Sequence, residues 1–455
     1  MLRIKNFHIA GWLFLWFIFS SYQPADTLPK NVVDSIEKRI ESGNNPSIAV
    51  GIIDEKGARY FNFGKMRKDG QAVDEHTIYE IGSITKVFTA ILLAQQAIKG
   101  KVSLDEPIDS YLPEDVVIPV QGADKITFGN LSDHTSGLPR MPENFKPANP
   151  GNPFADYTVA QMYSFISSYK PTRKVGSGYE YSNLAQGLLG HILAANAELE
   201  YESLMIRNIA SPLSMQETKI TLDQSMKDHL AIGHSAGTEV ENWDIPTLAG
   251  AGAIRSSTFD MLKFLSANLG FTKTPLKAAM DMTHEVRHSK AGNMRVGLGW
   301  HIKKGANGDV IWHNGGTGGY RAFAGFVKES GKGVVVLTNS NRSVDDIGFH
   351  LLDPDSKLME VASKSEAVAV SEETLESYVG NYQLAPNFSI AITRKGKQLY
   401  GQATGQNRFE LFAKNDTEFF LVVVDAQITF QVKEDAVESL TLFQNGQEIV
   451  GKKVD

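Results

Sequence analysis

Ser83 and Lys86 are the two residues whose types and spacing most directly predict chemistry. They lie in the segment Tyr-Glu-Ile-Gly-Ser-Ile-Thr-Lys (79–86), where an extended run ends at a glycine and apolar residues then recur at helical spacing. On a helix, a spacing of three brings the lysine ammonium to the same face as the serine hydroxyl. The serine also lies at the N-terminal end of that helix, where free N–H groups favour developing negative charge. The segment therefore predicts a nucleophile, a basic neighbour and part of an oxyanion site.

The Ser-x-x-Lys pattern is weak by itself, because it recurs at residues 35–38 and 167–170 on predicted surface helix faces. An ordinary exposed lysine is the alternative interpretation. Two later segments strengthen the assignment of Ser83. Tyr181 and Asn183, in a Tyr-x-Asn pattern, precede a helix-like run, and the sequence His-Asn-Gly-Gly (313–316) lies between two predicted strands. The three segments occur at a helix start, in a loop and at a sheet edge, and together they predict one catalytic site.

This ordered set resembles the penicillin-recognising serine hydrolases, which carry Ser-x-x-Lys followed by further short motifs. The chain is similar to the Tyr-x-Asn branch, which comprises class C β-lactamases, D-alanyl-D-alanine carboxypeptidases, D-aminopeptidases and related esterases. Further similarity lies in residues 131–139, 251–260 and 297–300. The resemblance spans roughly residues 30–350.

The resemblance implies a role for each motif residue. Ser83 would form an acyl-enzyme, which divides one difficult hydrolysis into two easier steps. Lys86 would act as a base if burial or a cationic neighbour lowers its pKa. Tyr181 would pass the proton to the leaving group and then activate water. Backbone N–H groups of Ser83 and Gly316 would hold the oxyanion, and Asn183 would bind the amide carbonyl of the substrate.

Residues His313, Asn314, Gly315 and Gly316 are predicted to bind substrate along the sheet edge. The two glycines would let the substrate lie close to the strand. His313 would face a carboxylate or polar tail, at a position where many relatives have Lys, and Asn314 replaces the more usual Thr or Ser. A neutral histidine attracts a carboxylate less than a lysine does. This difference shifts weight from β-lactam hydrolysis toward peptidase and esterase activity.

Several alternative interpretations stay open. Tyr181 could be a core tyrosine, and Asn183 could cap the following helix. His134, in a loop bounded by Gly and Pro, is interpreted as a structural hydrogen-bonding residue. His284 and His288 complete a His-Glu-x-x-His pattern, which is a zinc signature on a helix. Polar residues follow it at once and no third ligand stands out downstream, so we expect neither a metal nor another cofactor.

Composition limits the partners of the protein. The chain of 455 residues has a net charge of −7 and no basic block, so we expect a small-molecule or peptide substrate and no nucleic acid. It contains no cysteine, which excludes thiol catalysis, disulfides and Cys-based metal sites. We expect a monomer. A carboxylesterase of the same fold, or a sensor that is acylated without turnover by peptidoglycan or β-lactam, are the alternative functions.

Residues 1–25 have the features of a secretory signal peptide. Arg3 and Lys5 precede an apolar run over residues 9–19, and polar residues follow. The apolar run is short for a membrane-spanning helix. We therefore predict export to the periplasm or the medium, with membrane attachment only if the segment stays uncleaved as an anchor.

The order of predicted elements indicates an α/β fold. Strands at 47–54 and 58–64 precede a mainly helical middle, and short strands at 297–302, 310–313, 321–327 and 333–339 follow it. We predict an antiparallel sheet flanked by helices, with an inserted all-helical domain, over residues 30–356. A charged, Ala- and Ser-rich linker precedes residues 371–455, where short alternating strands predict a small all-β barrel similar to lipocalin-like β-domains.

Overall fold

The computed structural model describes residues 27–454, apart from 68, 121–123, 290–293, 360–366, 386–387, 405–407, 422–425, 435 and 445–446. The predicted signal peptide, residues 1–25, lies outside the described residues. None of the helices in the described part of the chain has the length and apolar content that crossing a bilayer requires.

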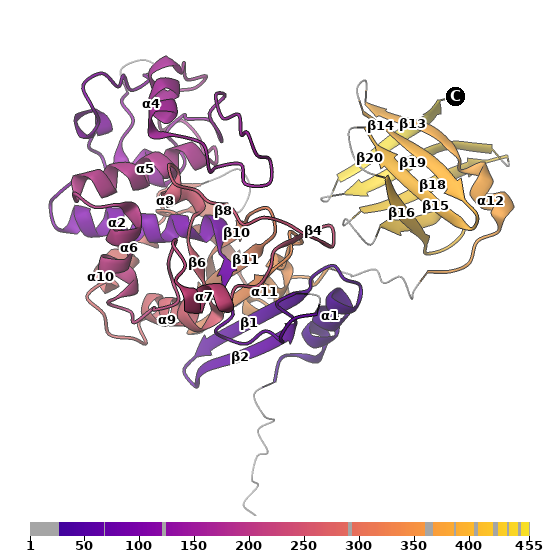
Figure 1. Cartoon of the computed structure of the whole chain (residues 1–455), viewed down its shortest axis with the longest axis horizontal. Helices are drawn as coiled ribbons and strands as arrows, with labels where there is room; N and C mark the ends of the chain where they lie inside the picture. Colours follow the sequence, from indigo (N-terminus) through magenta and orange to yellow (C-terminus); the bar gives the residue numbers. More distant parts are fainter. Residues whose placement is uncertain are drawn as a thin grey trace, which may run out of the picture.

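An eight-stranded antiparallel sheet forms the centre of the first part of the chain (Figure 1). Its strand order is β2-β1-β12-β11-β10-β9-β8-β7. Its strands are β1 (Ser47–Asp54), β2 (Gly57–Gly64), β7 (His288–Ser289), β8 (Met294–Val296), β9 (His301–Gly305), β10 (Gly308–Gly316), β11 (Arg321–Val327) and β12 (Lys332–Thr338). Strands β9 to β12 form an antiparallel meander, as the sequence predicts.

Helices cover both faces of this sheet. On one face lie α1 (Lys30–Glu41) and α11 (Asp345–Leu352). On the other lie α2 (Thr85–Ile98), α9 (Thr258–Leu269) and α10 (Lys277–Thr283), with the mainly helical region beyond them. That region holds α3 (Phe128–Ser132), α4 (Val159–Ser168), α5 (Asn183–Asn196), α6 (Tyr201–Met205), a π-helical turn (Ile206–Ala210), α7 (Gln224–Asp228) and α8 (Ala249–Gly252), and the short pairs β3 (Tyr79–Glu80) with β6 (Arg255–Ser256) and β4 (His234–Ser235) with β5 (Thr238–Glu239).

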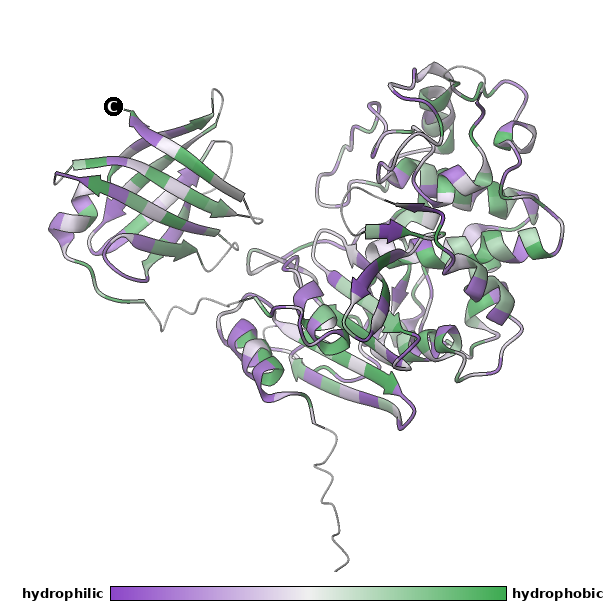
Figure 2. Cartoon of the chain, turned by 180° about the vertical axis from the view of Figure 1, so that it is seen from behind, coloured by the Kyte–Doolittle hydropathy of each residue, from purple (hydrophilic) through white to green (hydrophobic). Residues whose placement is uncertain are grey.

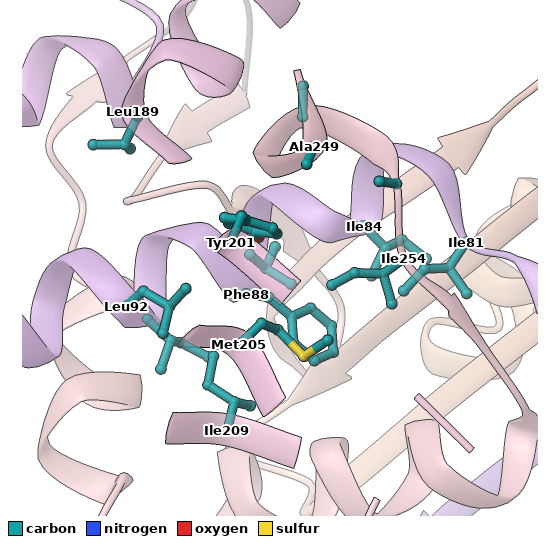
Figure 3. Packing of buried hydrophobic residues seen from close by; sticks show 14 of the residues in the cluster. Ile81, Ile84, Phe88, Leu92, Leu189, Tyr201, Met205, Ile209, Ala249 and Ile254 are labelled. Atoms are coloured by element: carbon teal, nitrogen blue, oxygen red, sulfur yellow. The ribbon is translucent and has the colours of Figure 1, made fainter. Parts of the chain in front are cut away.

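The central strands are buried on both faces, which explains their continuous apolar runs. Along β12, Val334 and Val336 join the core beneath α1 and α11, whereas Val335 and Leu337 join the core beneath α2 and α9. Figure 3 shows part of the second core, with Phe88 of α2 close to Met205. The catalytic motifs therefore lie on elements that are held by packing on several sides.

One strand prediction is wrong. Residues 297–302 do not form a single strand; β8 ends at Val296, β9 begins at His301, and a turn joins them. Gly299 in this turn has φ +70°, a conformation that favours glycine, and a Cβ there would lie 2.8 Å from the backbone oxygen of Lys86. The glycines therefore allow a tight turn against α2, which β-propensity alone does not reveal.

The second part of the chain forms a closed eight-stranded antiparallel barrel, which confirms the predicted all-β barrel. A short helix, α12 (Glu372–Ser377), precedes it. The strands are β13 (Gly380–Ala385), β14 (Phe388–Lys395), β15 (Gln398–Ala403), β16 (Arg408–Ala413), β17 (Glu418–Leu421), β18 (Ala426–Lys433), β19 (Ala436–Gln444) and β20 (Gln447–Val454). Hydrophobic and hydrophilic residues alternate along several of them (Figure 2), and the apolar ones fill the barrel. Among the described strands, the barrel shares none with the first sheet.

Candidate active site

Ser83 lies where a short strand turns into a long helix. It is the middle residue of a 3₁₀ turn (Gly82–Ile84) that joins β3 to α2. Gly82 has φ +50°, and a Cβ at that position would lie 2.6 Å from the backbone nitrogen of Gly316. The turn is therefore pressed against β10, and only glycine permits the approach. The predicted change from extended chain to helix at Gly82 is confirmed, with the 3₁₀ turn between them.

Lys86 lies one turn further along and points at the serine. Its Nζ donates to Ser83 Oγ at 2.9 Å and to the backbone oxygen of Ala251 at 2.6 Å. The side chain is fully buried. Burial holds the pKa of Lys86 well below its usual value, and the nearby positive charge of Arg140 lowers it further. As the sequence implies, Lys86 can act as a base only if its pKa is lowered, and burial together with Arg140 lowers it in the structure.

Tyr181 stands beside this pair, enclosed by aromatic and cationic groups. Its ring stacks on His134 with centroids 4.5 Å apart, and Lys86 Nζ lies 4.9 Å from the centre of the Tyr181 ring. Burial raises the pKa of Tyr181 to about 12, opposed by a hydrogen bond with Ser83 and by the charge of Arg140. The phenol therefore keeps its proton near neutral pH.

Asn183 is the first residue of α5, and it does not cap that helix. Ser182 is the N-cap, because its hydroxyl accepts from the backbone N–H of Ala185. The Asn183 side chain is partly buried, and its amide donates only weakly, to the sulfur of Met141 at 3.6 Å. The capping alternative for Asn183 is thus wrong, and its amide lies directly after Tyr181.

Strand β10 carries the third motif, and its residues alternate between two faces. His313 shares a face with Ile311, which packs in the core beneath α2, and its ring lies 6.2 Å from that of Tyr181. Asn314 shares a face with Trp312, which packs beneath α11, and its amide donates to Asp345 at 2.5 Å. The structure therefore brings His313 to the site and turns Asn314 toward α11.

The Asp345 carboxyl that receives this bond is itself partly buried. Burial raises its pKa to about 6, opposed by the hydrogen bond from Asn314 and by the nearby charge of Arg321. Asn314 thus has a structural partner on the far side of the strand, and its predicted role in binding substrate stays a prediction.

His313 is buried and uncharged. Its Nδ1 lies 2.6 Å from the carbonyl oxygen of Asn314, so Nδ1 carries the proton and Nε2 is left as an acceptor. Burial keeps the pKa of His313 well below its usual value, and the neighbouring His301 and Lys86 lower it further. His301 stacks on the His313 ring at 4.9 Å. The imidazole therefore offers no positive charge to a carboxylate at neutral pH.

Gly315 and Gly316 lie in close contacts that leave no room for a Cβ, and the sequence does not reveal these contacts. A Cβ at Gly315 would overlap the carbonyl oxygen of Ile81, and a Cβ at Gly316 would overlap the guanidinium of Arg321. Gly315 thus lets β10 approach the serine turn, and Gly316 leaves room for the Arg321 side chain; the predicted role of both in leaving room for substrate stays a prediction. Strand β11 pairs with β10 as far as Gly316, but β9 pairs with it only as far as Trp312. No described strand pairs with residues 313–316 on that second edge.

The structure does not support the alternative zinc site at His284 and His288. Helix α10 ends at Thr283, so His284 and His288 do not share a helix face. His284 Nε2 lies 2.9 Å from the side-chain oxygen of Asn268, and His288 Nε2 lies 3.1 Å from Asp133. Within the described residues no group of three or more His, Asp or Glu side chains is placed to hold a metal ion. Of the other two Ser-x-x-Lys matches, residues 35–38 lie within α1, whereas Ser167 lies at the end of α4 and Lys170 lies beyond that helix.

Two residues of the site carry no predicted role in chemistry. His134 accepts a hydrogen bond at Nδ1 from the backbone N–H of Ser182 at 3.1 Å and stacks on Tyr181, so it is a hydrogen-bonding residue as interpreted, and it also positions the tyrosine. The Arg140 guanidinium lies 5.0 Å from the centre of the Tyr181 ring. The sequence feature that could have pointed to both residues is the family-like segment 131–139, which contains His134 and ends one residue before Arg140.

Comparisons with known proteins agree with this geometry. The Beta-lactamase family model matches residues 32–350, and a domain of unknown function (DUF3471) matches residues 364–453. A beta-lactamase of Pseudomonas fluorescens is 30% identical over 348 residues, which cover 69% of this chain and 94% of that protein. A penicillin-binding protein of Bacillus subtilis (strain 168) is 25% identical, with 85% of this chain and 90% of that protein covered.

Solved structures give the same picture for the first part of the chain. A class C beta-lactamase is 25% identical with a TM-score of 0.62, covering 71% of this chain and 95% of that one. A beta-lactamase/D-alanine carboxypeptidase from Pseudomonas syringae has a TM-score of 0.61 at 23% identity, covering 69% and 94% respectively, which shows a shared fold.

Proposed function

The chain belongs to the beta-lactamase family of serine hydrolases, and we propose that it hydrolyses an amide, either a β-lactam or a D-amino-acid peptide, through an acyl-enzyme on Ser83. The observation that carries the proposal is the pairing of Ser83 Oγ with a buried lysine amine at 2.9 Å. A lysine whose pKa is lowered by burial can exist as the free amine at neutral pH and can accept a proton.

Acylation begins with proton transfer. With Lys86 uncharged, the Ser83 hydroxyl can donate to the amine lone pair, and its oxygen then attacks the carbonyl carbon of the substrate. The second acceptor of Lys86, the carbonyl oxygen of Ala251, fixes the direction of the amine. This arrangement supports Lys86 as the base of the acylation step.

The oxyanion and the substrate need donors that are fixed in advance. A Cβ at Gly82 would lie 2.6 Å from the backbone nitrogen of Gly316, and a Cβ at Gly315 would lie 3.2 Å from that of Ser83, so both nitrogens lie close to the contact between the serine turn and β10. We assign these two N–H groups to the oxyanion. The unpaired edge of residues 313–316 would then receive the substrate backbone as an added strand, with Asn183 holding its amide carbonyl.

Deacylation is assigned to Tyr181. Its protonated phenol is hydrogen-bonded to Ser83, so it can give a proton to the leaving group. After that transfer it can take a proton from the water that attacks the acyl-enzyme. Tyr181 thereby regains its proton, and Lys86 returns to Ser83 the proton that it took, so all three groups regain their starting states at the end of each cycle.

The test is turnover of nitrocefin and of 4-nitrophenyl esters by the purified protein. Sustained turnover of nitrocefin is expected. A stoichiometric burst without further product would indicate the sensor alternative, and turnover of esters with no reaction on any β-lactam or D-peptide would indicate the carboxylesterase. The relatives named above carry beta-lactamase, penicillin-binding-protein and carboxypeptidase titles, which do not favour either alternative.

The setting of the reaction is part of the same proposal. We propose that residues 1–25 direct export to the periplasm or the medium, that the protein is a monomer with a small-molecule or peptide substrate, and that it binds no nucleic acid. Residues 30–356 would form the hydrolase domain and residues 371–455 a separate barrel domain, which supplies none of the assigned catalytic groups.

A further inference from the structure

Arg140 is a charged residue of the site to which the proposed reaction assigns no contact with the substrate. It lies one residue after Pro139 and directly above the ring of Tyr181, with 5.0 Å between its guanidinium carbon and the ring centre. Lys86 approaches the same ring at 4.9 Å. Arg140 therefore stands within a few ångströms of the atoms that are assigned to proton transfer.

Backbone hydrogen bonds fix the position of Arg140. The carbonyl oxygen of Arg140 accepts from the N–H of Asn183 at 3.0 Å and more weakly from that of Leu184 at 3.4 Å. The carbonyl oxygen of the preceding Pro139 accepts from the Ser182 hydroxyl at 2.7 Å. These bonds attach the loop to the first turn of α5, so the arginine is held beside Tyr181 and Asn183.

The side chain of Arg140, by contrast, is exposed and has no acidic partner. Among the described residues, no carboxylate lies within ion-pair distance of its guanidinium and no acceptor takes a hydrogen bond from it. Arg173, which lies in a neighbouring loop, pairs with Glu180 at 3.0 Å, and Arg287 pairs with Asp133 at 3.0 Å. The five N–H donors of Arg140 thus face the solvent beside the nucleophile.

The other basic groups nearest the serine carry little charge. Burial favours the neutral forms of both Lys86 and His313, so neither supplies a fixed positive charge at neutral pH. A guanidinium keeps its charge at every physiological pH and fits a carboxylate with two parallel hydrogen bonds. Arg140 is consequently the group beside Tyr181 that is best suited to bind an anion.

We propose that Arg140 is a specificity-determining residue that binds an anionic group, preferably a carboxylate, on the acyl side of the scissile bond. The backbone N–H of Asn183 holds Arg140 beside Asn183, and we assign the side-chain amide of Asn183 to the acyl part of the substrate, whereas His313 lies on β10. This inference rests on the proposed function, because it deepens the same site by naming the substrate class. The preferred acyl donor carries a carboxylate in its acyl side chain.

Two pairs of substrates isolate this charge. Carbenicillin differs from benzylpenicillin by one carboxylate on the acyl side chain, and mono-4-nitrophenyl glutarate differs from 4-nitrophenyl butyrate in a similar way. The measured quantity is the ratio of kcat/KM for the anionic member to that for the uncharged-side-chain member. The ratio cancels any effect of Arg140 on the pKa of Lys86, because both members need the same base.

Arg140→Gln should lower this ratio about tenfold, mainly through a higher KM for the anionic member, as expected for one lost charge-assisted hydrogen bond. Arg140→Lys should recover part of the ratio. Lys146→Gln, which makes the same change of charge in the same exposed loop, is the matched control and should leave the ratio as in the wild type. Raising the ionic strength should lower the wild-type ratio and not that of Arg140→Gln.

The two proposals fail in different ways. A wild-type protein that turns over neither pair and no D-amino-acid peptide would overturn the proposed function, and the inference with it. One that hydrolyses a D-amino-acid peptide but neither pair would overturn the inference alone. A wild-type protein that turns over either pair, while Arg140→Gln changes both members in equal proportion or changes neither, would overturn the inference alone and leave the acyl-enzyme on Ser83 intact.

Discussion

The active site and the barrel each enclose a tyrosine, and the two tyrosines differ in what surrounds the hydroxyl. Tyr382 inside the barrel is fully buried, and its hydroxyl donates to the backbone oxygen of Tyr378 at 2.8 Å. Burial raises the pKa of Tyr382 well above its usual value. Tyr181 is also enclosed, but its hydroxyl is hydrogen-bonded to Ser83, and the Lys86 amine and the Arg140 guanidinium lie close to its ring.

The comparison indicates that burial alone does not give a tyrosine a catalytic function. Burial alone raises the pKa of a tyrosine and demands one acceptor for its hydroxyl, and the barrel meets that demand with a carbonyl group. The barrel core around Tyr382 consists of apolar residues and stacked rings, such as Phe430, which stacks on Tyr378 at 4.0 Å. The active site gives the hydroxyl a reactive partner instead. A buried tyrosine is therefore a candidate for chemistry only when its partner can react.

Within the comparison of the two tyrosines, the largest effect is expected for Tyr181→Phe. Removing a general acid and base typically slows a reaction by about 10²–10⁴-fold, and because deacylation should suffer at least as much as acylation, an adduct should accumulate. The measurement is steady-state turnover together with the mass of the intact protein during the reaction. Turnover at the wild-type rate would reduce Tyr181 to a packing residue and erase its difference from Tyr382.

The second prediction concerns pH. The free amine of Lys86 is the reactive form, so kcat/KM should rise about tenfold per pH unit up to the lowered pKa of Lys86 and then level off. Tyr181, with a pKa of about 12, should add no falling limb near neutral pH. Nor should His313 add a limb above pH ~6.5, because the pKa of His313 lies well below its usual value.

The control for the pH profile is Arg140→Gln. Removing this cation should raise the pKa of Lys86, because the nearby charge disfavours the ammonium form, and so move the rising limb to higher pH. A rising limb at the same pH in Arg140→Gln as in the wild type would argue against Lys86 as the buried base. A wild-type limb near the ordinary pKa of lysine would argue against it as well.

The smallest effect is expected for Tyr382→Phe, which is the matched change in the barrel. It removes the hydrogen bond to the Tyr378 carbonyl and should cost the barrel about 1 kcal/mol of unfolding free energy. Chemical denaturation followed by fluorescence measures this loss. Activity should stay within experimental error of the wild type, and a large loss of turnover would show that the barrel takes part in the reaction.

The sequence predicts the parts of this site that are encoded locally. Ser83 and Lys86 are three residues apart, and a helix turn alone brings them together. Strand β1 (Ser47–Asp54) and strand β11 (Arg321–Val327) lie within residues 47–54 and 321–327, as predicted, because their alternation and apolar runs are also local.

The features that sequence reasoning missed depend on contacts between distant segments. The turn at Gly299 and the close approach of Gly315 to Ile81 both depend on contact with the backbone of another element, which no local pattern reveals. The same holds for His134, whose stacking on Tyr181 joins positions 47 residues apart, and for Arg140, whose neighbour Asn183 lies at the start of α5.

The most direct test of the central claim is the mass of the protein trapped with a slow β-lactam or an activated D-amino-acid ester. The wild type should gain the mass of one acyl group, and peptide mapping should place it on Ser83. Ser83→Ala should gain none and should lose more than about a thousandfold in turnover, since removing a nucleophile that acts as a unit with its base typically costs that much. Ser35→Ala, the matched change on α1, should acylate as the wild type does. An adduct on any other residue, or full turnover by Ser83→Ala, would contradict the account.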